Sequence, residues 1–214
     1  MRAKFFTFCI WVLIASGAFL FTSGFLDYWE SRSAQHEIAE EWQDSAAGSA
    51  PAPTPESSPA APPVSTDRHA PEGFRAPVGN AVAKLSIPRL DIALYVVEGT
   101  GNRQLKRGPG HLTGSALPGE DGNCVIAGHR DTHFSVLKNI RDGDEIVLER
   151  GGRKFRYRVD GMEVVTPDNT ASLQPTRDAV LNLITCYPFQ YIGAAPKRFI
   201  VHAELEDAPL SAAR

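Results

Sequence analysis

Between residues 81 and 207, apolar residues come in short runs, and many of these runs alternate with polar residues. Runs of this kind are separated by clusters of glycine, proline, aspartate and asparagine, and they read AVAKLSI, ALYVVE, NCVIAGH, EIVLE, KFRYRVDGMEVVT, AVLNLITC and RFIVHAEL. Alternation of apolar and polar side chains is typical of half-buried β-strands, and glycine and proline mark the turns between strands. The pattern therefore predicts seven or eight strands in a closed or sandwich-like all-β domain.

Helices are expected to be few and short within this domain. The two helix-compatible segments are THFSVLKNI, which begins at residue 132, and ASLQP, which begins at residue 171. Consecutive glycines in ERGGRK, residues 149–154, indicate a β-hairpin tip, because glycine adopts the positive φ angles that tight hairpin turns need. Residues 208–214 are predicted to be a tail beyond the domain.

The chain begins with an apolar run, residues 5–26, that contains no charged side chain. At about 1.5 Å per residue, this run has roughly the length needed to cross the hydrocarbon core of a bilayer. Basic residues precede it and acidic residues follow it, namely Arg2, Lys4, Asp27 and Glu30. This distribution of charge predicts that residues 1–4 stay in the cytoplasm and that the rest of the chain lies outside.

A cleaved signal peptide is the alternative interpretation of this run, since residues 15–18 are small, as a signal peptidase requires. The apolar core of a signal peptide is usually about 7 to 15 residues long, and the run is longer. We therefore expect an uncleaved, single-pass anchor in the cytoplasmic membrane. Either interpretation places the β domain outside the cytoplasm, in the periplasm if the cell is Gram-negative.

Residues 27–80 connect the expected anchor to the β domain. Residues 27–43 are polar and helix-compatible and contain aromatic residues suited to a membrane interface or a partner surface, which predicts a juxtamembrane helix. The rest of the connection is rich in proline, alanine and serine and has almost no large apolar side chains. Such a segment cannot bury enough surface to offset the entropy of ordering its backbone, so we expect an extended, semi-rigid stalk.

The charge of the chain argues against a nucleic-acid partner. Its 22 basic and 25 acidic residues leave a formal net charge of -3, and no broad basic field results. Of its three cysteines, Cys9 lies within the expected anchor, which leaves Cys124 and Cys186 in the exported part. Oxidising conditions there favour pairing of the two thiols unless one is kept free for chemistry.

Cys186 is the first candidate for such chemistry. It ends an apolar strand and precedes Tyr187 and Pro188, and because proline cannot continue a central strand, the thiol is expected at a strand end facing a loop. A nucleophilic thiol needs exposure and positive charge nearby, since only the thiolate attacks. His129, which closes the strand CVIAGH, and Arg198, which opens FIVHAEL, are candidates to provide that environment.

Each candidate also has a purely structural explanation: Cys186 as a buried core thiol, His129 as a loop or capping residue, and Arg198 as a solvated charge at a strand entry. Cys124 competes as nucleophile, or as a disulfide partner for Cys186. It shares strand parity with Ile126 and not with His129, so its side chain is expected to point away from the histidine. We therefore favour Cys186 as the nucleophile.

A metal site is not expected. The histidines and the exported cysteines show no paired ligand spacing, and His129 and His133 lack the intervening glutamate of the zinc-protease signature. The segment TPDNTASLQP, residues 166–175, supplies one carboxylate, which is too few for a calcium cage. We predict that the protein needs neither a metal nor another cofactor.

Segments across the whole β domain resemble the sortase family of cysteine transpeptidases. The similar segments are KLSIPRLDIALYVVEGT, GHLTGSALPGEDGNCVIAGHRDTHFSVLKNIRDGDEI, LITC and PKRFIV, the last two matching the TLxTC signature and the arginine-bearing strand. Within the family, the chain is most similar to the Gram-negative subgroup and to the related class D. Asn182 departs from the pattern, because the signature begins with threonine at that position.

This resemblance implies a closed eight-stranded β-barrel with short helices. It also implies an exported substrate protein with a C-terminal sorting signal of the LPxTG kind, a thioester intermediate and an amine acceptor of the cell envelope. By position, Cys186 matches the family's nucleophile, His129 its acid and base, Arg198 its carbonyl-binding guanidinium, and Thr185 its substrate-orienting residue.

His111 and His133 are further candidates for the lining of the cleft and for contact with substrate, and turn-stabilising polar roles are their alternative. Two other functions remain open. A thiol peptidase would pass the acyl group to water, and a non-catalytic β-module would bind envelope proteins. Product analysis with an added amine would distinguish a thiol peptidase from a transpeptidase. Alkylation would distinguish a binding module from an enzyme, because a Cys186 that does not react in the folded domain would favour the binding module.

Overall fold

The computed structural model describes residues 11–18, 21–22, 33–43, 76–191 and 193–206. Within these residues, a barrel of eight strands begins at β1. The strands are β1 (Ala81–Ile87), β2 (Ile92–Glu98), β3 (Gly110–His111), β4 (Asn123–Gly128), β5 (Glu145–Arg150), β6 (Arg153–Val165), β7 (Val180–Tyr187) and β8 (Lys197–Leu205). Short helices connect them: η1 (Pro88–Leu90), α2 (Asn102–Arg107), η2 (Ser135–Asn139) and η3 (Ala171–Leu173).

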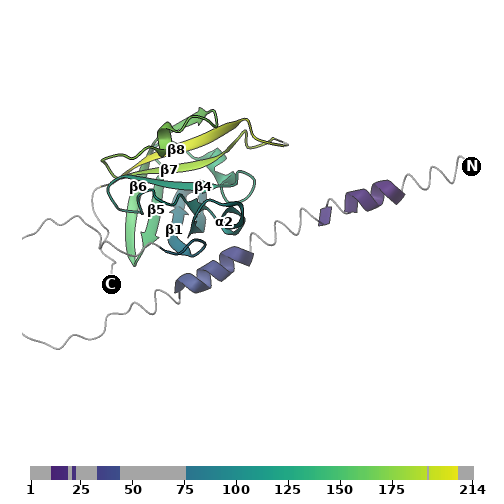
Figure 1. Ribbon diagram of the computed structural model, residues 1–214, viewed down its shortest axis with the longest axis horizontal. Helices are drawn as coiled ribbons and strands as arrows, with labels where there is room; N and C mark the ends of the chain where they lie inside the picture. Colours follow the sequence, from purple (N-terminus) through teal and green to yellow (C-terminus); the bar gives the residue numbers. More distant parts are fainter. Residues whose placement is uncertain (1–10, 19–20, 23–32, 44–75, 192, 207–214) are drawn as a thin grey trace, which may run out of the picture.

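The strands close in the order β1-β2-β3-β4-β7-β8-β6-β5. All pairs are antiparallel except β2 with β3 and β4 with β7, which are parallel (Figure 1). The parallel pair β4 and β7 brings together two strands that are separated by β5 and β6 in the sequence. The expectation of a closed eight-stranded barrel with short helices is confirmed.

One apolar core fills the barrel and is made of alternate residues from seven of the eight strands. Its fully buried side chains include Leu85, Ile126, Leu148, Leu183 and Val201. Each lies at an apolar position of an alternating run, so burial of one face of the sheet explains the pattern seen in the sequence. The core therefore determines which residues of each strand face outward.

The long strand β6 follows the hairpin expected at residues 149–154. Gly151 and Gly152 have φ angles of 56° and 73°, which confirms that the two glycines form the turn. Further along, the register with β8 shifts between Val159 and Gly161, so β6 bends there and stays paired with β8 up to Val165. The sequence pattern did not predict β3 or α2, since β3 has only two residues.

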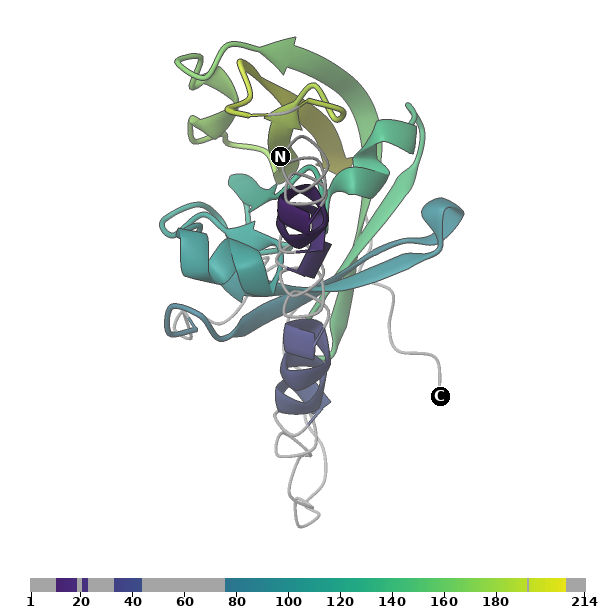
Figure 2. The same ribbon diagram turned by 90° about the vertical axis from the view of Figure 1, so that its right-hand side faces the viewer.

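Residues 33–43 form a helix that packs against the outside of the barrel, with Ile38 fully buried. In Figure 1 and Figure 2 this helix lies at the lower side of the barrel, whereas β7 and β8 lie at the upper side. The helix falls within the juxtamembrane helix expected at residues 27–43. It contacts the protein's own barrel, so its packing face is not free for a membrane or for another protein.

Several expectations concern residues outside the described part of the chain. They include residues 1–4, much of the anchor at 5–26, the stalk at 44–75 and the tail at 208–214. Within the described residues, no helix combines the length and the apolar character that crossing a bilayer requires. The anchor stays a prediction.

Candidate active site

The three residues expected to carry chemistry lie on, or directly after, three adjacent strands of the barrel wall, since His129 immediately follows the last residue of β4. Cys186 on β7 is paired directly with Arg198 on β8. On the other side of β7, Gly128 is paired with Thr185 in the parallel register of β4 and β7. The next residues along these two strands are His129 and Cys186, so the register brings the imidazole, the thiol and the guanidinium into one row across the wall.

All three side chains belong to the outer face of the sheet. On β7 the core residues are Leu181 and Leu183, and Cys186 has the opposite parity. On β8 the core residues are Val201 and Ala203, which leaves Arg198 on the outside. Because side chains alternate along a strand, the core positions alone direct the thiol and the guanidinium away from the interior.

The two cysteines of the barrel differ sharply in their surroundings. Cys186 is half-buried and free, and Cys124 is also free but only 1% exposed, packed in the core. Burial, with a smaller contribution from the nearby Glu120 carboxylate, raises the pKa of the Cys124 thiol well above its ordinary value. Cys124 is therefore not a source of thiolate, and it faces the opposite side of the wall from Cys186, so the disulfide considered above does not form.

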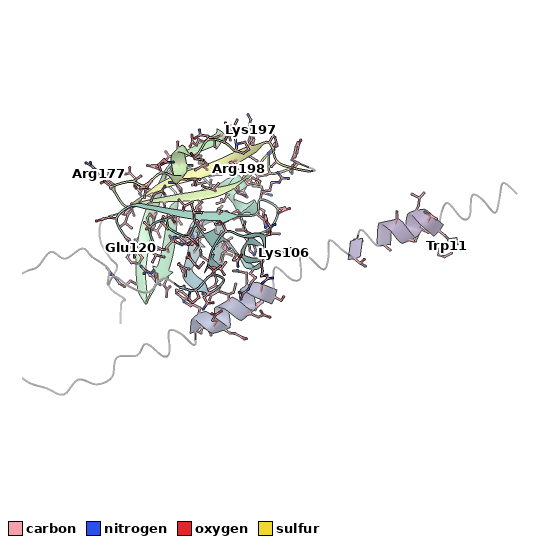
Figure 3. All side chains as sticks on the ribbon, viewed as in Figure 1. Trp11, Lys106, Glu120, Arg177, Lys197 and Arg198 are labelled. Carbon is pink, nitrogen blue, oxygen red and sulfur yellow. The ribbon has the colours of Figure 1, made fainter. Side chains whose placement is uncertain are left out.

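Arg198 is held by the backbone beside it. Its Nη1 donates to the carbonyl of Lys197 at 3.0 Å and to that of Ala195 at 3.3 Å. Figure 3 labels Arg198 and Lys197 on the upper part of the molecule, on the side away from helix 33–43. The guanidinium keeps other N–H groups that these two hydrogen bonds do not use.

Arg130 follows His129 and ties it to the loop between β7 and β8. Its Nη2 donates to the carbonyls of Tyr191 at 2.9 Å and Gly193 at 3.1 Å, and its guanidinium lies 5.8 Å from the centroid of the Tyr191 ring. Cys186 and Arg198 each lie one residue inside the strand end that borders this loop. Sequence reasoning missed Arg130, although its place directly after His129 was the available signal.

Thr185 is buried, with 2% of its surface exposed, and its hydroxyl donates to the Gly128 carbonyl at 2.7 Å. This hydrogen bond joins β4 to β7 directly below the row of His129 and Cys186. The threonine faces the core, so in this structure it supports the site from inside and does not line the surface where a substrate would lie.

The other two histidines proposed as substrate contacts are buried as well. His111 is 1% exposed, and its Nδ1 lies 2.7 Å from Glu98 Oε2 while its Nε2 lies 2.9 Å from Ser115 Oγ. His133 is 7% exposed, with its Nδ1 3.3 Å from Thr132 Oγ1. For His111 the structure therefore shows the turn-stabilising role, because its partners join β2 to the loop after β3.

A chain of polar side chains crosses the outer face further along the same strands. Asn182 Nδ2 donates to Asn123 Oδ1 at 2.7 Å, Asn182 Oδ1 lies 2.5 Å from His202 Nδ1, and His202 Nε2 lies 3.2 Å from Glu163 Oε1. Asn123 also donates to carbonyls of the loop between β6 and β7, at Ser172 and Gln174. Asn123 thus anchors this loop to the sheet, and Asn182, at the first position of the TLxTC-like segment, supports Asn123 through a hydrogen bond.

A groove of about 400 Å³ lies between this loop and the sheet, lined by Asn123, Glu163, Gln174, Asn182 and His202 among others. One cross-strand pair, Ile184 with Ile200, separates the pair Asn182 and His202 from the pair Cys186 and Arg198. The groove and the cysteine therefore share one face of the barrel.

Within the described residues, no cluster of three or more histidine, cysteine or acidic side chains is arranged to hold a metal ion. The row at the ends of β4, β7 and β8 offers a half-buried thiol, an imidazole and a fixed cation. This is the equipment of nucleophilic acyl transfer, in which a thiolate attacks a carbonyl and a cation stabilises the oxyanion.

Comparison with known families agrees with this chemistry. A family model described as the sortase domain matches residues 85–206, which include the three residues of the row. Sortase D of Bacillus subtilis strain 168 is 37% identical to the chain over 133 residues, covering 61% of this chain and 67% of that protein.

Solved structures give the same result. A sortase D5 transpeptidase from Clostridium perfringens aligns with a TM-score of 0.56 and 27% identity, over 62% of this chain and 82% of that one. Sortase A from Corynebacterium diphtheriae aligns with a TM-score of 0.55 and 34% identity, over 60% of this chain and 61% of that one.

Proposed function

This chain belongs to the sortase family of cysteine transpeptidases, with a class D-like character, and we propose that Cys186, His129 and Arg198 are its catalytic residues. The observation that carries the assignment is the strand register. It pairs Cys186 with Arg198 and sets His129 beside Cys186 from the parallel neighbour. No comparable set surrounds Cys124, which lies in the core.

The first half of the reaction cleaves a peptide bond. The Cys186 thiolate attacks the carbonyl carbon of the substrate, and the Arg198 guanidinium stabilises the negative charge that develops on the carbonyl oxygen. The C–N bond then breaks, and the leaving amine takes a proton from the His129 imidazolium. The product is a thioester between the substrate and Cys186, together with a neutral imidazole.

The second half transfers the acyl group. An amine acceptor attacks the thioester carbon and gives its proton to the neutral His129, and the C–S bond breaks to restore the thiolate. Each proton lost in the first half is recovered in the second, so the enzyme returns to its starting state. Water in place of the amine gives the hydrolytic outcome.

We further propose that the substrate is an exported protein with an LPxTG-like sorting signal near its C-terminus. The groove beside Asn182 and His202 supports this proposal, because it lies on the same face of β7 and β8 as Cys186. The acceptor would be an amine of the cell envelope, and the apolar run at residues 5–26 would hold the enzyme in the cytoplasmic membrane.

Substitution of each of the two cysteines in turn tests the catalytic assignment. We expect Cys186→Ala to abolish cleavage of an LPxTG-like peptide, and Cys124→Ala to retain most of the activity, since it removes only a small buried group and costs about 1 kcal/mol of stability. Mass spectrometry of the protein incubated with peptide would detect the thioester on Cys186. After an amine is added, the thioester should disappear and the peptide–amine product should appear. Equal loss of activity in both variants, with folding intact, would reverse the assignment.

The same experiment separates transfer from hydrolysis. With a transpeptidase, the ligated product rises with amine concentration while the hydrolysed product falls. A product ratio that is independent of the amine identifies a thiol peptidase instead. If Cys186 in the folded protein resists iodoacetamide, the barrel would be a binding module without catalysis.

A further inference from the structure

The ladder of backbone hydrogen bonds between β2 and β3 is short, although the barrel is closed. The Val97 N–H donates to the Pro109 carbonyl and the Gly99 N–H to the His111 carbonyl, both at 2.9 Å. Two residues along β2 therefore correspond to two residues along the segment that contains β3. Continued by one step, this register places Tyr95 opposite Arg107. Arg107, however, is the last residue of α2, and its carbonyl makes no such contact with Tyr95.

The side chain of Gln35, from helix 33–43, occupies this gap. Its Oε1 accepts a hydrogen bond from the Tyr95 N–H at 2.8 Å, and its Nε2 donates to the carbonyls of Arg107 at 2.8 Å and Tyr95 at 3.2 Å. A primary amide carries the same donor and acceptor as a peptide group. Gln35 thus adds one rung to the β2–β3 ladder from outside the sheet.

The rest of the helix fits the same place. Ile38 is fully buried and Ala34 is 8% exposed, and the ring of Trp42 lies 6.3 Å from that of Tyr95. On the barrel side, a Cβ added to Gly108 would stand 2.5 Å from Gln35 Nε2 and 2.6 Å from the Tyr95 carbonyl oxygen. The lack of a side chain at Gly108 is therefore what allows the amide to enter.

We propose that this seam, made of Tyr95, Arg107 and Gly108, is a docking site for helix 33–43 of the same chain. Unpaired backbone groups at a sheet edge recruit a partner, and here the partner is a side-chain amide supported by a small apolar contact. Helix 33–43 lies at the lower side of the barrel in Figure 1, away from β7 and β8, so docking and catalysis use different surfaces.

The docking has a consequence for reach, which rests on the membrane anchor proposed above. With helix 33–43 on the barrel, the distance from anchor to barrel is set by the few residues between 26 and 33. Without docking it would be set by residues 44–75 as well, and a proline-rich segment extends by about 3.1 Å per residue, which permits roughly 100 Å. Docking would hold the barrel close to the bilayer.

Hydrogen exchange of the Tyr95 amide in the full chain tests the docking. Gln35 is the partner of this amide, so we expect exchange at Tyr95 to become at least about 10-fold faster in Gln35→Ala, with other β1–β2 amides unchanged. Gln35→Glu should behave similarly, because a carboxylate cannot donate to the Tyr95 and Arg107 carbonyls. Gln43→Ala, an exposed position on the same helix, is the matched control.

The rate at which the enzyme cleaves a soluble peptide substrate should stay within about twofold of wild type in all three variants, since helix 33–43 and Cys186 lie on different sides of the barrel. The proposal is overturned if Tyr95 exchanges at the wild-type rate in Gln35→Ala, or if Gln43→Ala accelerates it equally. Neither result depends on the catalytic assignment, so the two proposals fail separately.

Fluorescence resonance energy transfer tests whether docking shortens the distance between the barrel and the bilayer. In a Cys9→Ser background, a dye on Cys186 and an acceptor lipid in vesicles report the distance from barrel to bilayer. We expect lower transfer in Gln35→Ala than in Gln43→Ala. Equal transfer in the two variants would overturn the consequence for reach, and no transfer in any variant would overturn the anchor, while the exchange experiment decides the docking in either case.

Discussion

At the scale of residues, the site depends on which face of the sheet each side chain occupies. Adjacent residues Thr185 and Cys186 have opposite tasks: the first bonds to the Gly128 carbonyl inside the barrel, and the second presents its thiol outside. Cys124, on β4, has the inward-facing parity, and this places it in the core. A strand slipped by one residue would exchange these roles.

Arg130 provides a test at this scale. We expect Arg130→Ala to lower kcat/KM for peptide cleavage about 10-fold, equivalent to about 1.4 kcal/mol, because the loop between β7 and β8 loses its two hydrogen bonds to Arg130. Arg153→Ala is a matched control, since Arg153 also lies over an aromatic ring, that of Phe155, but on the β5–β6 hairpin.

Arg130→Lys separates charge from geometry, because lysine keeps the charge but lacks the planar fork that reaches two carbonyls. We expect it to resemble Arg130→Ala in kcat. Full activity in the lysine variant would show that only the charge matters, and an equal loss in the Arg153 control would show a general effect on the barrel.

At the scale of elements, the parallel pair β4 and β7 is the basis of the site, and the turn after β4 secures it. Phe134, just before η2, is fully buried and packs against Gly128, and its N–H donates to the His129 carbonyl at 2.9 Å. The position of the His129 imidazole therefore depends on the contact between Gly128, at the end of β4, and Phe134. Nothing larger than glycine fits at residue 128.

Substituting Gly128 by alanine tests this contact. The added Cβ would stand 2.6 Å from the Phe134 ring, which has no room to move, so we expect a loss of about 1–3 kcal/mol in the free energy of unfolding and lower activity. Urea unfolding measures the first quantity. In the control Gly161→Ala the nearest atom is 3.9 Å away, and a comparable loss there would contradict the explanation.

At the scale of the whole molecule, long-range contacts close the barrel, and an ion pair between the exposed Arg89 and the buried Asp144 reinforces the closure. Asp144, before β5, is paired with Arg89 of η1 through both carboxylate oxygens and accepts a hydrogen bond from the Arg141 N–H at 2.8 Å. The hydrogen bonds from Arg89 hold the pKa of the Asp144 carboxyl below its usual range, against the opposing effect of burial.

This pair predicts a specific response to acid. Because the pKa of Asp144 is lower in the folded than in the unfolded protein, the stabilisation is fully present above the unfolded value, about 3.9, and is lost as pH falls through the folded value. Asp144→Asn should therefore lower stability at pH 7 and flatten its dependence on pH below about 4. Denaturant unfolding at pH 7 and pH 3 measures both effects. A constant difference between variant and wild type at the two values would contradict the prediction.

The sequence by itself determined the positions of seven of the strands, the hairpin at Gly151 and Gly152, and the opposite orientations of Cys124 and His129. These features are local, because alternation of side chains and the φ angles of glycine act over a few residues. The same pattern made Cys186, His129 and Arg198 candidates, and the resemblance to the sortase family then implied their catalytic roles.

Only the tertiary structure decided that Thr185 and His111 face inward, that Arg130 holds the β7–β8 loop, and that Gln35 completes the ladder at Tyr95. Each depends on partners far away in the sequence, such as Gly128 for Thr185 and Tyr191 for Arg130. The short strand β3 begins only after α2 has ended, and this leaves a gap that a distant helix fills. Periodicity carries no information on such pairings, because they arise from the closure of the barrel.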